Sequence, residues 1–244
     1  MSEQAGEAGY MAEARERLIE AALPHVVFDG WSAETLQRAV EDSGVEGSLA
    51  QLAFPRGGVD LALGFHRMMD ARLAAELAET DLATMRIRDR VTHCVRRRIE
   101  LVADHRDAVR RGATLLALPP YVAESTRALW DTADTIWSAC GDRSDDVNWY
   151  TKRAILSTVL SSTVLYWLGD ESLDNAATWG FLDRRIENVM QFEKMKGAVQ
   201  ANPLTRAAFW LPGQILGQIR APHARRPQRE TGPVDPAGKA PSTG

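Results

Sequence analysis

The side chains suited to proton transfer or metal binding include five histidines scattered along the chain: His25, His66, His93, His105 and His223. None stands in an H-E-x-x-H motif or in the Glu-x-x-His spacing by which helix bundles hold two irons. Asp70 follows His66 by four residues, so the two would share one helical face. The same holds for Asp89 and His93. We interpret both pairs as surface hydrogen bonds, with half of a proton relay as the alternative.

Other catalytic patterns do not occur in the sequence either. There is no G-x-S-x-G nucleophile elbow, no P-loop and no glycine fingerprint between a strand and a helix. Cys94 and Cys140 lie far apart and outside any metal-ligand spacing, so we interpret them as reduced core thiols. The sequence therefore predicts a protein that is not an enzyme and has no cofactor.

The composition is that of a globular protein with a substantial core. The 244 residues are 45% hydrophobic and 25% charged, with a formal net charge of −4. Such a mild charge gives no general attraction for nucleic acid or anionic lipid, so any such partner needs a local patch. No run of about eighteen uncharged apolar residues exists, and nothing is expected to span a bilayer.

Helices must position whatever site exists, because strand signals are nearly absent and apolar spacings of three and four recur. We expect an all-α protein of nine or ten helices. Ser32 should cap the second helix and Gly44 should end it. The helix over 147–168 is apolar on almost every side and is expected to be the buried spine of the larger part. The expected helices cover 11–28, 33–42, 46–54, 59–78, a segment from 81, a restart at 119–120, 147–168, 173–194 and 202–220.

The first three expected helices have the rhythm of a helix-turn-helix unit, and this stretch resembles the N-terminal domain of TetR-type repressors. DNA binding needs Lys and Arg for the phosphates. From Arg15 to Asp60 the chain has four basic and eight acidic residues, and the would-be recognition helix VEGSLAQLAF has no basic residue. We therefore expect no nucleic-acid partner. A TetR-type transcriptional regulator with a small hydrophobic effector is the alternative.

Four segments carry a more specific resemblance: GWSAETL, ALPPYVAESTRALWDTADTIWSACGD, DDVNWYTKRAIL and TWGFLDRRIENVM. They resemble the coenzyme Q biosynthesis protein 9 family over about Arg15 to Met195. The resemblance implies a TetR-like fold that holds an isoprenoid quinone or phospholipid-type lipid and associates with the di-iron demethoxyubiquinone hydroxylase. The expected parts are a helix-turn-helix-like module (10–56), a bundle with a lipid pocket (57–197), an amphipathic C-terminal helix (198–220) and a disordered tail (221–244).

The first residues of the sequence and the TetR-like topology also lead to an expected location and an expected assembly. The start of the sequence has neither an apolar signal core nor an Arg-rich transit peptide, so we expect a bacterial cytoplasmic protein, peripheral on the inner membrane. By analogy with the TetR bundle, we expect a homodimer through the helices that bear NWYTKRA and TWGFLDRR.

A docking patch for the hydroxylase is implied at the start of the helix over 147–168. Successive helical residues are about 100° apart, so Trp149 and Tyr150 cannot both enter the core, and one ring should be exposed. Exposed aromatics beside basic residues suit an interface. The alternative is that both rings only pack against a neighbouring helix. The expected patch is Asp146, Trp149, Tyr150 and Arg153.

The lipid pocket that the resemblance implies is assigned to apolar residues on the bundle helices, although any one of them would serve equally as core. The candidates are Leu115, Leu116, Leu118, Tyr121, Leu129, Trp130, Ile136, Trp137, Leu156, Leu160 and Val164.

A membrane contact is expected in the last helix, which is amphipathic, too short to span a bilayer and flanked by arginines. Pro212 and Gly213 should kink it, and docking on the bundle or on a second subunit is the alternative. The expected membrane-facing residues are Leu204, Phe209, Trp210, Leu211, Ile215, Leu216 and Ile219. The Arg-rich stretch from Arg86 to Arg111 is interpreted as a solvated helix face and left without a role.

Overall fold

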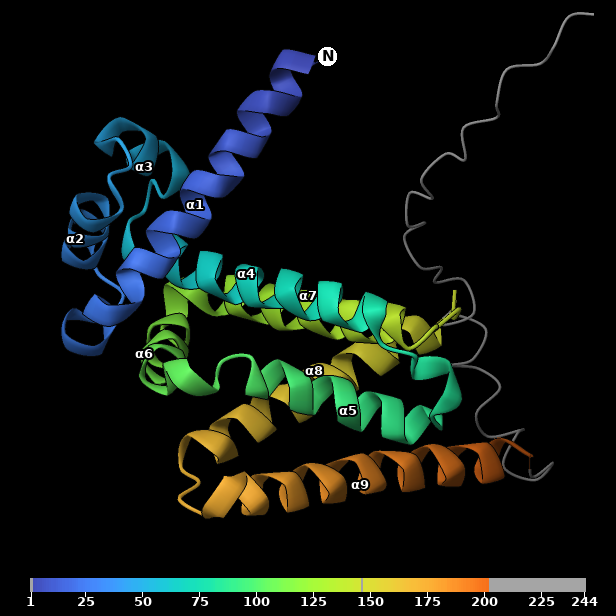
Figure 1. The fold of residues 1–244 in the computed structure, drawn as a ribbon. Helices are drawn as coiled ribbons and strands as arrows, with labels where there is room; N and C mark the ends of the chain where they lie inside the picture. The colour runs from blue at the N-terminus through green and yellow to red at the C-terminus, as the bar shows by residue number, and fades with distance from the viewer. Residues whose placement is uncertain (1, 146, 202–244) are drawn as a thin grey trace, which may run out of the picture.

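The computed structural model describes residues 2–145 and 147–201, and every regular element in these ranges is helical (Figure 1). Short 3-10 turns lie between several of the helices, at Leu82–Thr84, Ala103–His105, Pro119–Tyr121 and Leu173–Asn175. The prediction of an all-α protein is confirmed. The α-helices are α1 (Ser2–Asp29), α2 (Ala33–Ser43), α3 (Gly47–Ala53), α4 (Gly58–Glu79), α5 (Ile87–Glu100), α6 (Arg106–Leu116), α7 (Val122–Ala139), α8 (Val147–Leu168) and α9 (Ala176–Ala201).

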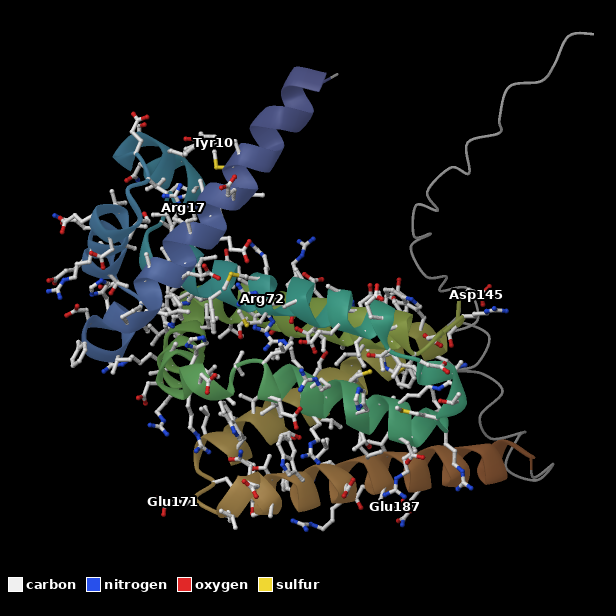
Figure 2. All side chains as sticks on the ribbon, viewed as in Figure 1. Tyr10, Arg17, Arg72, Asp145, Glu171 and Glu187 are labelled. Carbon is white, nitrogen blue, oxygen red and sulfur yellow. The ribbon has the colours of Figure 1, made fainter. Side chains whose placement is uncertain are left out.

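Helices α1 to α3 form a module at one end of the molecule (Figure 1). The backbone N–H of Thr35 donates to Ser32 Oγ at 3.1 Å and caps α2. Gly44 ends that helix with φ of +66°, a conformation that favours glycine. Both caps agree with the sequence prediction. The module is tied to the bundle by Arg72 of α4, which bridges to Glu16 and Glu20 of α1 at 2.9 and 2.6 Å (Figure 2).

The bundle is built from α4 to α9. Helices α4 and α7 lie side by side, α5 packs against α4 and α9, and α8 packs against α7 and α9 (Figure 1). One hydrophobic core runs through both parts of the molecule and includes Leu18 of the module and Met69, Ile136 and Leu160 of the bundle. The module and the bundle therefore share a core.

The helix boundaries differ from the expected ones at both ends. Helix α1 begins at Ser2, nine residues before the expected start at 11. Helix α9 continues to Ala201, so the expected division between bundle and C-terminal helix at 197–198 falls inside a helix. Helix ends are the least reliable part of a prediction from sequence pattern, because adding residues at the end of a helix hardly changes its apolar periodicity.

Helix α8 is not buried on all sides, contrary to the expectation. Leu156, Leu160 and Trp167 are buried, whereas Leu165 is 64% exposed and Tyr166 is 40% exposed. Neighbouring helices cover α8 on the sides of α7 and α9, and one stripe stays open. An apolar sequence made α8 look central, but the packing of the bundle leaves this stripe on the surface.

The Arg-rich stretch is a solvated face only in part, since Arg96 and Arg110 are exposed whereas Arg98 is buried, and several of its arginines make tertiary links. Arg106 donates to the carbonyls of Trp167 and Asp170, and Arg110 donates to Leu168 O at 2.8 Å. The carbonyls of Trp167 and Leu168 lie at the C-terminal end of α8, where the last carbonyls have no partner within the helix, and Asp170 lies in the turn that follows. Arg106 and Arg110, which the sequence suggested were solvated, thus make tertiary hydrogen bonds to the end of α8 and the turn after it.

No helix in the described ranges is long and apolar enough to cross a membrane. The expected membrane helix and the tail fall on residues 202–244, outside the described residues, as does Asp146 of the expected docking patch.

Candidate functional site

A cavity of about 290 Å³ lies between α4, α5, α6, α7 and α8, beside Trp31 at the turn from α1 to α2. Most of its lining is apolar, with Phe65 from α4, Leu116 from α6, and Val164 from α8. Its size falls at the lower end of the range of roughly 300–1,000 Å³ that is typical of ligand pockets. The fold therefore provides a small apolar chamber inside the bundle.

Four of the eleven nominated lipid-binding residues line this cavity: Leu116, Leu129, Leu160 and Val164. The other seven do not. Ile136 and Leu156 are buried in the main core, while Leu115 and Tyr121 pack against a small cluster with Val59 and Leu63. The rest are Leu118, which is 48% exposed, Trp130, which contacts Trp149, and Trp137, whose indole donates to Lys152 O at 3.1 Å. Apolar type alone did not separate core from cavity, because both are lined by the same kinds of residue.

A polar network forms part of the cavity wall and was not predicted. The Thr132 hydroxyl lies 2.9 Å from His66 Nε2 and donates to Asp70 Oδ2 at 2.8 Å. Arg98 Nε donates to Asp70 Oδ1 at 2.7 Å, and the Arg98 side chain is only 9% exposed. His66 Nε2 also lies 3.3 Å from Asp70 Oδ2. The interpretation of His66 and Asp70 as a surface hydrogen bond was therefore wrong, because the pair is part-buried and linked to two other helices.

The Asp70 carboxylate is the centre of this network. Burial would raise the pKa of Asp70, but hydrogen bonding by His66 and the charges of His66 and Arg98 outweigh burial and lower that pKa. Asp70 is therefore ionised at neutral pH and pairs with the Arg98 guanidinium. The sequence signal for this site was present in the spacing of His66 and Asp70, but only the fold adds Arg98 and Thr132.

The described residues of the expected docking patch, Trp149, Tyr150 and Arg153, belong to α8, which begins at the end of the bundle away from the α1–α3 module, where Asp145 is seen in Figure 2. The rings of Trp149 and Tyr150 meet edge to face with centroids 4.8 Å apart. Trp130 of α7 contacts both rings, at 5.7 and 6.1 Å. Both are half-buried, so the expectation of one exposed ring is not met, and both rings pack against α7. The aromatic cluster Trp130, Trp149 and Tyr150 forms part of the surface.

Arg153 lies beneath this aromatic cluster instead of beside it on the surface. Its side chain is 3% exposed and pairs with Asp134 at 2.5 Å and with Asp142 at 3.1 Å. Its guanidinium also lies 4.0 Å from the ring centroid of Trp149. The expectation that Arg153 is an exposed cation of the patch is therefore wrong. The residue supports the aromatic cluster from below.

The Asp142 carboxylate fixes the loop that precedes α8. It receives hydrogen bonds from Lys152 Nζ at 2.8 Å and from the Ser144 hydroxyl at 2.8 Å. Burial would raise its pKa, but the hydrogen bonds from Lys152, Ser144 and Arg153 outweigh burial and lower the pKa of Asp142 to about 2. The turn between α7 and α8 is thus held by charge pairs on both sides.

Cys94 and Cys140 lie close together although they are 46 residues apart in the chain. Their Sγ atoms are 4.0 Å apart, and both are free and buried. The interpretation as core thiols is confirmed. No group of three or more His, Cys, Asp or Glu side chains in the part of the chain that the structure describes could hold a metal ion.

Comparison with known proteins gives consistent relatives. The COQ9 family model matches residues 122–193, which span α7, α8 and most of α9. The mitochondrial ubiquinone biosynthesis protein COQ9 of Drosophila melanogaster is 32% identical over 83% of this chain and 65% of its own length. Protein COQ9-B of Xenopus laevis is 31% identical over 78% of this chain and 68% of its own length.

The chain belongs to the COQ9 family. The human COQ9 protein is 30% identical over 72% of this chain and 57% of its own length. The chain therefore spans less than two thirds of the fly and human proteins that it matches. The COQ9 match includes the aromatic cluster and the α7 and α8 walls of the cavity.

The COQ9 relatives contradict the expected location. The fly, rat and human proteins are eukaryotic and are named as mitochondrial. The prediction of a bacterial cytoplasmic protein on the inner membrane was therefore wrong. It rested on the composition of the first residues, which does not determine where a folded domain works.

A solved structure supports the fold of this COQ9 member. A TetR transcriptional regulator from Nitrosomonas europaea superimposes with a TM-score of 0.58 at 19% identity, over 71% of this chain and 95% of that chain. At this identity the likeness shows the fold alone, and the TetR-like prediction is confirmed. Helix α3, which corresponds to the recognition position, exposes Ser48, Gln51 and Leu52 and has no basic residue.

Proposed function

We propose that this chain is a non-catalytic accessory protein of ubiquinone biosynthesis that holds a lipid-like quinone precursor and presents it to the di-iron demethoxyubiquinone hydroxylase at a membrane. The observation that carries the proposal is the cavity of about 290 Å³ between five bundle helices. Membership of a family whose relatives are named ubiquinone biosynthesis proteins supplies the pathway. Apolar lining with few polar groups is what a lipid-like ligand requires.

The size of the cavity limits how much of a long ligand it holds. Burial of apolar surface drives binding, and a chamber of this volume takes a ring or a short chain. Leu165 lines the cavity and is 64% exposed, so the chamber reaches the surface of α8 at this residue. In the proposed complex, the rest of a long isoprenoid leaves the bundle past Leu165.

Lipid extraction after native purification, followed by mass spectrometry, tests the cavity. Ala113 lines it from α6, and Ala113→Phe should fill it and lower the amount of bound lipid at least severalfold. Thr114→Phe is the matched control, because Thr114 is the next residue on the same helix, is exposed and does not line the cavity. Equal lipid in both variants, or no lipid in the native protein, contradicts the proposal.

The aromatic cluster Trp130, Trp149 and Tyr150 is the proposed contact for the hydroxylase. Half-buried aromatic rings give a large contact area that loses little entropy on binding, which is typical of interface hot spots. Arg153 holds Trp149 in place from below and does not itself reach the partner. Asp146 is retained as a proposed contact from the sequence alone.

Two further surfaces belong to the proposal. Tyr166 of α8 is 40% exposed and stacks on Phe181 of α9, and the face of these two helices around Tyr166 is the proposed contact between two copies of the chain. Residues 202–220 are the proposed membrane contact. Sedimentation equilibrium should give the mass of a dimer that becomes a monomer in Tyr166→Asp. Liposome flotation should separate the full chain from one that ends at Ala201, and equal flotation would contradict the membrane contact.

A further inference from the structure

Two thiols face each other where α5 meets the C-terminal end of α7. Cys94 lies within α5, and Cys140 ends α7 at the start of the loop that leads to α8. Their Sγ atoms are 4.0 Å apart, and the two residues are 0% and 3% exposed. The sulfurs of a disulfide lie about 2 Å apart, so each Sγ would need to move by only about 1 Å to form the bond.

Arg90 fixes the position of Cys140 from the same face of α5 as Cys94. The two residues of α5 are four apart in the helix and therefore share a face. Arg90 Nη1 donates to Cys140 O at 3.1 Å, while its Nε and Nη2 donate to Met85 O and Ala83 O, each at 2.9 Å. One residue of α5 thus holds the backbone of Cys140, and another faces its thiol. This arrangement keeps the two sulfurs close.

The surroundings of Cys140 favour its thiolate form. The hydrogen bond from Cys94 and the positive charge of Arg90 lower the pKa of Cys140, and they outweigh burial and the charge of Asp142, which would raise it. The three hydrogen bonds of Arg90 all go to backbone carbonyls, so its charge has no carboxylate partner among the described residues. The thiolate is the nucleophilic form of cysteine. Cys140 is therefore the thiol that reacts first.

We propose that Cys94 and Cys140 form a reversible intramolecular disulfide when the protein is exposed to a hydroperoxide such as hydrogen peroxide. The Cys140 thiolate attacks one peroxide oxygen, the O–O bond breaks, and the departing hydroxide takes up a proton to become water. Cys140 is then a sulfenic acid. The Cys94 sulfur attacks the Cys140 sulfur, and the hydroxyl group of the sulfenic acid leaves as a second water with the proton of Cys94.

This reaction balances without another reactant. The two thiols lose two electrons and two protons in total, and the peroxide gains them and becomes two molecules of water. Cys94 can act in the second step although it is buried, because its sulfur already lies against that of Cys140 and needs no external reagent to reach it. A dithiol reverses the reaction by thiol–disulfide exchange.

The disulfide would join α5 to the loop that precedes α8. That loop runs from Cys140 past Asp142 to Asp145, which is labelled in Figure 2 at the end of the bundle away from the α1–α3 module. The bond would close a chain segment that spans 46 residues, which lowers the entropy of the unfolded chain and stabilises the fold. The inference goes beyond the proposed function, because it depends neither on a ligand in the cavity nor on a partner protein.

Treatment of the folded full chain with hydrogen peroxide at pH 7 tests the bond. Alkylation and peptide mass mapping without reduction should then show peptides joined through Cys94 and Cys140, two hydrogens lighter than the separate peptides, and dithiothreitol should restore both thiols. In Cys94→Ser the sulfenic acid has no thiol to meet, so Cys140 should gain oxygen instead. In Cys140→Ser, Cys94 should stay unmodified. Free thiols in the treated native chain, or a disulfide between two chains in place of the internal one, overturns the inference.

Thermal unfolding separates a bond that fits the native fold from one that forms only after the chain has opened. The peroxide-treated native chain should melt roughly 5–15 °C higher than the same sample after dithiothreitol, as expected for closure of a long segment. Both serine variants should show no such difference, and they control for oxidation of methionine because they keep every methionine. A crosslinked protein that melts no higher than the reduced one, or a crosslink that forms only in denaturant, overturns the inference.

Discussion

The guanidinium carbon of Arg153 lies 4.0 Å from the ring centroid of Trp149, although the Arg153 side chain is only 3% exposed. The same guanidinium pairs with Asp134 and Asp142, which anchor it to α7 and to the loop before α8. Arg153 is thus a buried cation, paired with two carboxylates, that supports the ring of Trp149 in the aromatic cluster. The charge acts on the proposed partner site only through the position of the ring.

Removal of the buried Arg153 side chain should lower the free energy of unfolding more than removal of the exposed Lys152 side chain. Arg153→Ala leaves Asp142 buried with only Lys152 to compensate it, and we expect a loss of about 3 kcal/mol in the free energy of unfolding. Lys152→Ala is the matched control. Lys152 is 38% exposed, so the loss should be about 1 kcal/mol or less. Urea denaturation measures both, and equal losses would show that burial of Arg153 has no special weight.

The aromatic cluster should bind the hydroxylase through Trp149. Trp149→Ala should lower co-purification with the hydroxylase at least tenfold, as expected for a hot-spot residue, and the bundle should stay folded. Trp179→Ala on α9 is the control, because Trp179 is also half-buried and also stacks on an arginine, Arg96, at 4.7 Å. Co-purification that is unchanged in Trp149→Ala contradicts the proposed contact.

Acid should weaken the cavity network in a definite direction. The pKa of Asp70 is lowered by folding, so its contribution to stability is complete above the ordinary carboxyl pKa of about 4 and is lost as the pH falls through the lower folded value. The contribution of Asp142 to stability is lost over the same acidic pH range, since the pKa of Asp142 in the folded protein is about 2. His66 and Arg98 face Asp70 and are present in both the native chain and Asp70→Asn. The difference in unfolding free energy between the two proteins therefore reports the contribution of the Asp70 carboxylate. That difference should shrink from pH 6 to pH 2.5, and a constant difference would contradict the lowered pKa.

Gly58 should not tolerate a side chain. A Cβ at this position would lie 2.1 Å from the backbone oxygen of Trp31, and backbone cannot move aside as a flexible side chain can. Gly58→Ala should therefore destabilise the chain by about 3 kcal/mol or more. Gly9→Ala should do the opposite. Gly9 lies in α1 with nothing within 4 Å, and alanine favours a helix by up to about 1 kcal/mol. Thermal unfolding monitored by circular dichroism should show a lower melting temperature for Gly58→Ala and a higher one for Gly9→Ala.

The thiol of Cys94 should be inert to external reagents in the folded protein. The hydrogen bond with Cys140 and burial together raise the pKa of Cys94, and a thiol with a raised pKa forms little of the reactive thiolate. A disulfide reagent such as Ellman's reagent should therefore modify Cys94 only at the rate of unfolding, and rapidly in denaturant. Fast labelling of Cys94 in the native state would show that α5 opens locally.

The sequence alone determined the helical class, the caps of α2 and the family, because these depend on local spacing, on single residues such as Ser32 and Gly44, and on contiguous segments. It also gave four residues of the cavity. It could not separate these from Ile136 or Leu156, since apolar side chains look alike until the rotation of each helix about its axis is known.

Only the tertiary structure decided which charges are buried. His66 and Asp70 share a helix face that the sequence shows, but Arg98 and Thr132 come from α5 and α7 and meet that face through packing. Arg153 looked like a surface cation next to two aromatic rings, and the carboxylates of Asp134 and Asp142 made its burial possible. A buried charge needs a partner within a few ångströms, and residues distant in the chain supply that partner only after the helices have packed.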